Sequence, residues 1–134
     1  MSYYISITLD QSFDKSVEMV VEALNKEGFG VLADIDVKAT MKKKLDVDFR
    51  NYRILGACIP PFAHKALEAE DKIGVLLPCN VIVQELKPGM VEVAAVNPVS
   101  SMQAVDNEEL HSVAKEILEK LKRVIAFLEQ GRKS

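Results

Sequence analysis

The sequence of 134 residues contains no tryptophan and only two cysteines, so it excludes a small secreted domain built on disulfides. Glycine (6 residues) and proline (5 residues) are sparse, which excludes collagen-like and low-complexity chains. The longest apolar run, residues 73–78, is far shorter than the roughly 20 residues that span a bilayer. With 49% hydrophobic and 28% charged residues, the composition is that of a compact globular domain.

Basic residues do not predominate either. The formal net charge is −3, which argues against the overall basicity of a nucleic-acid-binding domain. The first residues show no basic leader, apolar core or small-residue cleavage site of a secretory signal. Together with the sparse cysteines, these observations predict a cytoplasmic protein that does not bind membranes.

The periodicity of apolar residues predicts one α+β domain over residues 1–134, with residues 131–134 as a tail. Strands are expected near residues 3–9, 29–35, 52–58, 81–86 and 90–96, and helices near 12–28, 36–45, 60–70 and 107–130. Residues 73–77 also look strand-like, up to the break at Pro78. The first strand alternates between apolar and polar side chains, which predicts a sheet covered by helices on one face.

Both cysteines lie at predicted strand ends beside proline, in Leu55-Gly56-Ala57-Cys58-Ile59-Pro60-Pro61 and Leu76-Leu77-Pro78-Cys79-Asn80-Val81. Cys58 directly precedes a predicted helix, whose dipole could lower the pKa of its thiol. Against this, Pro60 and Pro61 lack the amide hydrogens that would stabilise a thiolate, and the sequence places no histidine beside either cysteine. Three interpretations are open: two small buried hydrophobic side chains, a shared functional site, or a disulfide.

A zinc site would need Cys58 and Cys79 to join the two histidines, His64 and His111. The spacing of these four residues matches no closed zinc motif, and His64 falls on the polar side of its predicted helix. We therefore expect neither a metal nor another cofactor.

Residues 37–53 form a basic segment within the acidic chain. Six basic side chains, which include Lys38, Lys42, Lys43 and Lys44, stand against Asp46 and Asp48 and give a local charge of +4. With the aromatic residues Phe49 and Tyr52, this segment could contact an anion or a single-stranded nucleic acid. The alternative is a solvated helix face, so a nucleic-acid partner is not our main expectation.

No nucleophile elbow, Walker A loop or dinucleotide-binding glycine motif occurs, so the sequence leaves open whether the protein is an enzyme. Asp34 and Asp36 alternate on one predicted strand face and could act as an acid–base pair. The alternative is that they are solvated or capping carboxylates at a strand end.

The two cysteine motifs, together with Gly28-Phe29-Gly30-Val31-Leu32, Asp36-Val37-Lys38-Ala39-Thr40 and Tyr52-Arg53-Ile54-Leu55, resemble the domain of unknown function 302 family over residues 3–130. The resemblance implies an α+β fold similar to the TATA-binding-protein-like class, with a curved, mostly antiparallel sheet backed by helices. It also implies a homodimer, but it does not indicate which reaction, if any, the protein catalyses.

Three functional hypotheses follow. The first is a dimeric domain that binds a small molecule in a cleft near the two cysteine strand ends, with the candidate residues Cys58, Cys79, Asn80, Tyr52 and Arg53. The second is a thiol- or sulfur-handling protein that uses Cys58 and Cys79. The third is anion or nucleic-acid contact through the basic segment.

Overall fold

The computed structural model describes residues 2–131, so residues 132–134 of the predicted tail lie outside the described residues. A five-stranded antiparallel sheet has the strand order β1-β5-β4-β3-β2 and does not close into a barrel. The strands are β1 (Tyr4–Leu9), β2 (Gly30–Asp36), β3 (Tyr52–Cys58), β4 (Cys79–Lys87) and β5 (Met90–Val96). The α+β class and the helix-backed antiparallel sheet predicted from the sequence are confirmed.

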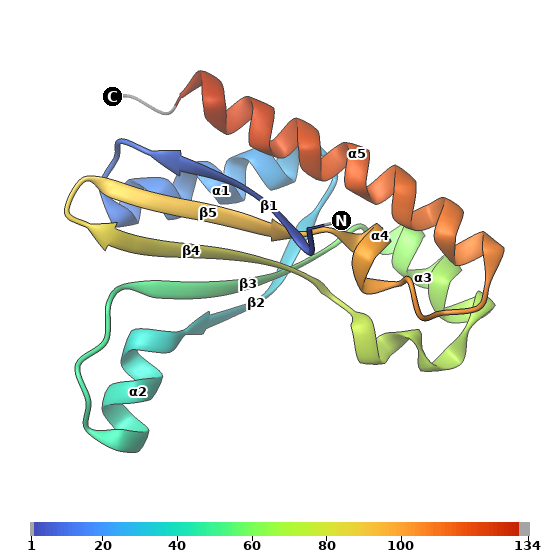
Figure 1. Ribbon diagram of the computed structural model, residues 1–134, viewed down its shortest axis with the longest axis horizontal. Coiled ribbons are helices and arrows are strands. Elements are labelled where there is room, and N and C mark those ends of the chain that lie inside the picture. Colours follow the sequence, from blue (N-terminus) through green and yellow to red (C-terminus); the bar gives the residue numbers. More distant parts are fainter. Residues whose placement is uncertain (1, 132–134) are drawn as a thin grey trace.

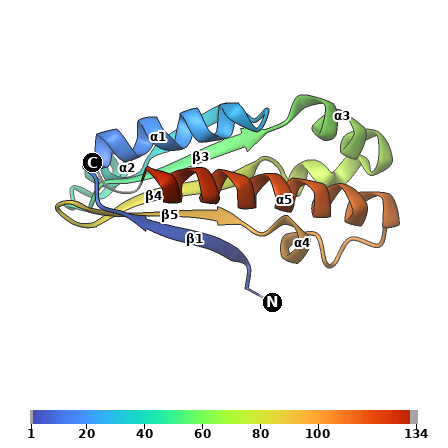
Figure 2. The same ribbon diagram turned by 90° about the horizontal axis from the view of Figure 1, so that it is seen from above.

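Two long helices cover one face of this sheet (Figures 1 and 2). They are α1 (Phe13–Lys26) and α5 (Glu108–Gln130), and their apolar stripes pack on β1, β4 and β5. Leu24 and Leu121 are fully buried in this main core. Within residues 2–131, no helix is both long enough and apolar enough to span a membrane.

The helix ends follow local chemistry. The Ser12 hydroxyl accepts from the Lys15 amide at the start of α1, and the Asn107 side chain accepts from the Glu109 and Leu110 amides at the start of α5. Gly28 follows α1 with φ +88°, a conformation that glycine adopts without a steric penalty. These caps fix the directions in which the two covering helices leave the sheet.

A smaller layer caps one end of the sheet. It contains α3 (Pro60–Ala69), the 3-10 helix η1 (Asp71–Leu76) and α4 (Pro98–Ser101), which lie together at the right of Figure 1. A second core cluster holds this layer against the start of α5, with the buried side chains Ala66, Ile73, Met102, Leu110 and Ala114.

Two parts of this layer differ from the elements expected from the sequence. Residues 73–77 are mostly in η1 rather than a strand, because Ile73 packs into the second core cluster and pairing with β3 begins only at Cys79. Residues 98–101 form α4 rather than a loop, with the Asn97 side chain accepting from the amides of Val99 and Ser100.

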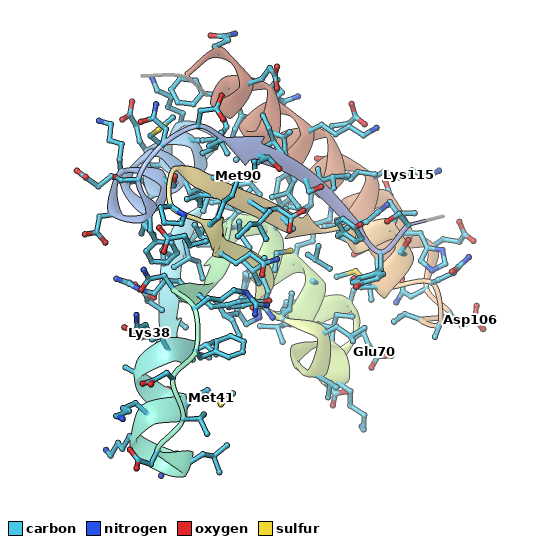
Figure 3. All side chains as sticks on the ribbon, turned by 60° about the vertical axis from the view of Figure 1, so that its left-hand side comes forward. Lys38, Met41, Glu70, Met90, Asp106 and Lys115 are labelled. Carbon is cyan, nitrogen blue, oxygen red and sulfur yellow. The ribbon has the colours of Figure 1, made fainter. Side chains whose placement is uncertain are left out.

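The remaining helix, α2 (Val37–Leu45), stands apart from the other helices. The Asp36 carboxylate caps it by accepting from the Ala39 amide, and its backbone contacts are mainly with β2 and β3. Figure 3, in which Lys38 and Met41 are labelled, shows α2 extending away from the body of the molecule.

Candidate functional site

A cavity of about 290 Å³ lies where the sheet meets the capping layer. Ala57 and Cys79 contribute from β3 and β4, and Cys58 and Ile59 lie at the passage from β3 into α3. The other walls come from α3, η1, α4 and α5, and the lining includes Phe62, Ala63, Ala66, Leu67, Met102, Val113, Ala114 and Ile117. Elements from most of the chain therefore meet at this one cavity.

Small side chains create the space. Ala57, Ala63, Ala66 and Ala114 each present only a methyl group to the cavity, and Gly74 presents none. Larger residues around them, such as Phe62 and Ile117, hold the walls apart. A void of this kind is wet or dry according to the polarity of its lining.

The lining is almost entirely apolar. Among the described residues that line the cavity, none carries a carboxylate, an amine, a guanidinium, an imidazole or a hydroxyl group. The only titratable groups are the thiols of Cys58 and Cys79. Such a site can bind an apolar molecule, but it offers no general acid or base for catalysis at neutral pH.

The cavity is open to solvent, and apolar side chains line its opening. Leu32 of β2 and Leu67 of α3 line it and are 68% and 44% exposed. Large aliphatic side chains at an opening let an apolar molecule enter without crossing a charged rim.

Both cysteines are free, and each lies partly buried in the wall of this cavity. Burial raises the pKa of the Cys58 thiol, so the start of α3 does not lower it. Pro60 and Pro61 occupy the first positions of α3 and lack the amide hydrogens that would stabilise a thiolate. Of the three interpretations, the disulfide is not the one that the structure has, since both thiols are free.

Burial, and to a lesser degree the neighbouring Cys58, raises the pKa of Cys79 to about 11. In the unfolded chain this thiol ionises near its ordinary pKa of 9.0. Between these two values the unfolded state loses its proton first, so the free energy of unfolding falls as pH rises.

We expect wild-type protein to lose about 1 kcal/mol more unfolding free energy between pH 8 and pH 10 than a Cys79→Ala variant. Urea denaturation of both proteins at the two pH values measures this difference. Parallel pH profiles would show that the Cys79 thiol titrates normally and is not desolvated in the fold.

The other candidate ligand residues do not line this cavity. Tyr52 and Asn80 line a separate depression on the sheet face that bears no helix. Arg53 donates a hydrogen bond of 2.6 Å to Asp34, which raises the pKa of the arginine. The structure thus brings Cys58 and Cys79 together and leaves Asn80, Tyr52 and Arg53 elsewhere.

The acidic pair has structural roles instead. Asp34 forms the ion pair with Arg53, and Asp36 caps α2, so these two carboxylates are not an acid–base pair. This outcome matches the alternative of capping carboxylates at a strand end.

The four-ligand zinc set does not form. His64 pairs with Glu68 at 3.3 Å on the exposed side of α3, and His111 Nε2 lies 2.6 Å from the Val105 carbonyl oxygen. Over the described part of the chain, no three His, Cys, Asp or Glu side chains come together as a metal site.

Sequence reasoning missed the walls supplied by α3, α4 and α5. Val113, Ala114 and Ile117 belong to the apolar stripe predicted for the last helix, and nothing local marks them as facing a cavity. The one available signal was the spacing of Ala63 and Ala66, which places two small side chains on one face of α3, the face that lines the cavity.

The fold and the site together define an open antiparallel α+β domain with an apolar cavity between its sheet and its helical cap. The chain belongs to the family described as Domain of unknown function DUF302, which matches residues 5–128.

A similar solved structure is the crystal structure of the uncharacterized conserved protein DUF302 from Bacillus stearothermophilus. It is 23% identical, covers 95% of this chain and 98% of its own chain, and superposes with a TM-score of 0.86. At this identity the similarity shows the fold alone. No curated protein matches the sequence.

Proposed function

We propose that this protein binds a small, uncharged apolar molecule in the cavity between β3, β4, α3 and α5. The observation that carries the proposal is the apolar cavity of about 290 Å³, which reaches solvent between exposed aliphatic side chains. Small-molecule sites are concave and mostly apolar, and their volumes range upward from about 300 Å³. The absence of charged groups from the described lining favours binding over catalysis.

The thiol-handling hypothesis has less support. A reactive cysteine needs an accessible thiolate, but burial raises the pKa of both thiols and the cavity lining supplies no basic partner. Cys58 and Cys79 fit better as small apolar wall residues. Their free thiols also suit a reducing compartment, so we assign this binding activity to the cytoplasm.

The nucleic-acid hypothesis also has less support. The Arg50 guanidinium lies 4.5 Å from the Phe49 ring centre and 5.5 Å from that of Tyr52. The guanidinium therefore covers part of the aromatic surface that would stack on bases.

Titration with N-phenyl-1-naphthylamine, a neutral apolar fluorophore, tests the proposal. We expect a saturable rise in probe fluorescence that fits one site per chain. The dissociation constant should lie in the micromolar range, which corresponds to a binding free energy of about −8 kcal/mol. Since the chain has no tryptophan, the protein's own emission interferes little. A purely linear, non-saturating signal would overturn the proposal.

A further inference from the structure

The volume of the ligand cavity limits the size of its occupant. The cavity measures about 290 Å³, and an apolar cavity of roughly 150 Å³ is enough to hold benzene. The space is therefore that of two fused six-membered rings. A larger molecule must extend through the opening, where the side chains of Leu32 and Leu67 are exposed.

The walls exclude a polar occupant. Almost no polar atom of the described residues faces the cavity, and the thiols of Cys58 and Cys79 are weak hydrogen-bonding groups. A hydroxyl, amine or carboxylate group inside would lose its hydrogen bonds to water and find no replacement on these walls. The buried part of the ligand is therefore a hydrocarbon.

Sulfur atoms distinguish an aromatic hydrocarbon from a saturated one. Both cysteines of the chain line the cavity, and so does Met102, which directly follows α4 and is 5% exposed. A methionine sulfur packs favourably at the edge of an aromatic ring, and a thiol is a weak donor that can meet the electron-rich face of the ring. A saturated ring gains neither contact.

Two phenylalanines favour the same class of ligand. Phe29, which directly precedes β2 and is 2% exposed, and Phe62 of α3 both line the cavity. Their rings attract a further aromatic ring through offset-stacked or edge-to-face contacts, in addition to the apolar area that any hydrocarbon buries. Together with the sulfur atoms, these rings make the walls more favourable to an aromatic than to an aliphatic ligand.

We propose that the ligand of this cavity is a neutral, planar aromatic molecule whose buried part consists of about two fused rings without polar substituents. This inference rests on the proposed apolar binding function and names the chemical class of its ligand. In the complex with N-phenyl-1-naphthylamine, the naphthyl group would fill the cavity, and the amine and phenyl groups would lie at the opening.

Competition against bound N-phenyl-1-naphthylamine tests the aromatic class. Naphthalene should displace the probe at a concentration at least about threefold lower than cyclooctane, a saturated ring of similar size and greater hydrophobicity. Hydrophobicity alone would favour cyclooctane, so this preference must come from contacts to the aromatic rings. Equal displacement by the two compounds, or tighter binding of cyclooctane, would overturn the proposal.

Naphthalene-2,6-diol tests the exclusion of polar groups. Its two hydroxyl groups lie at opposite ends of the ring system, so one of them is buried in either orientation along the cavity. We expect displacement of the probe to need at least about tenfold more diol than naphthalene, because the buried hydroxyl finds no hydrogen-bond partner. Equal affinities for the two compounds would contradict the proposal.

The Met102→Leu variant tests the contribution of sulfur. Leucine is apolar and similar in volume to methionine, so the cavity keeps its size. The variant should bind naphthalene about threefold more weakly than wild type and cyclooctane equally well, whereas a structural disturbance would change both affinities. An unchanged affinity for naphthalene would contradict the role assigned to the sulfur atoms.

The matched control is Met19→Leu, the same substitution at a partly buried residue that packs on the main core and does not line the cavity. It should leave the affinities for naphthalene and cyclooctane as they are in wild type. Circular dichroism verifies that both variants are folded.

The outcomes separate this inference from the proposed function. If the probe binds at one site and cyclooctane displaces it as well as naphthalene does, the cavity binds apolar molecules of either class and only the aromatic assignment fails. If the probe shows no saturable binding, the proposed function fails and this inference fails with it.

Discussion

The Ala63→Leu variant is expected to bind N-phenyl-1-naphthylamine at least about tenfold more weakly than wild type, a loss of about 1.4 kcal/mol or more. Ala63 lies half-buried on α3 and presents only its methyl group to the cavity. Leucine extends an aliphatic branch into the space that the probe would occupy. Because leucine favours helices nearly as well as alanine does, α3 itself should be unaffected.

The matched control for this substitution is Ala126→Leu. Ala126 is exposed on α5 and does not line the cavity, so the same change there should leave probe affinity within about twofold. Fluorescence titration of the two variants and wild type gives the comparison. Equal affinities for Ala63→Leu and wild type would place the probe outside the cavity.

The Gly56→Ala variant is expected to lose about 1–3 kcal/mol of unfolding free energy, the usual cost of overpacking. A Cβ atom on Gly56 would lie 2.7 Å from Pro78 Cγ and 3.3 Å from Ala33 Cβ. The Pro78 ring is rigid and lines the cavity next to Cys79, so relief of the clash must move that wall. Probe affinity should therefore fall together with stability.

Gly30→Ala is the control for this substitution, because it changes the same residue type in the neighbouring strand. A Cβ on Gly30 would meet only the Cys58 carbonyl oxygen, at an ordinary contact distance of 3.9 Å. Its stability should stay within about 0.5 kcal/mol of wild type in urea denaturation. Equal stabilities of the two variants would show that the contact between Gly56 and Pro78 is not tight.

Much of the fold could be predicted because local patterns determined it. Ile5, Ile7 and Leu9 alternate toward the core as expected, and Asp36 caps the helix that it was predicted to start. The apolar run at 73–77 was ambiguous, since a short apolar run suits a strand or a buried helical turn equally well. Only the distant contact of Ile73 with the second core cluster resolves it.

The site was less predictable because it is not local. The sequence singled out Cys58 and Cys79, but the alanines and aliphatic residues that form the cavity extend from β2 to α5. The sequence left two alternatives open for Cys58, a thiol activated by the following helix and a small buried side chain, and burial raises the pKa of this thiol. The composition indicated a compact globular domain, but it could not show that this domain encloses an apolar cavity.

The most direct test of the ligand-binding proposal is nuclear magnetic resonance of methyl-labelled protein with bound N-phenyl-1-naphthylamine. Binding in the cavity predicts intermolecular nuclear Overhauser effects from the probe to the methyl groups of Ala63, Ala66 and Ile117. Contacts confined to Ile82 and Ala94, on the sheet face that bears no helix, or the absence of any saturable contact, would contradict the proposal.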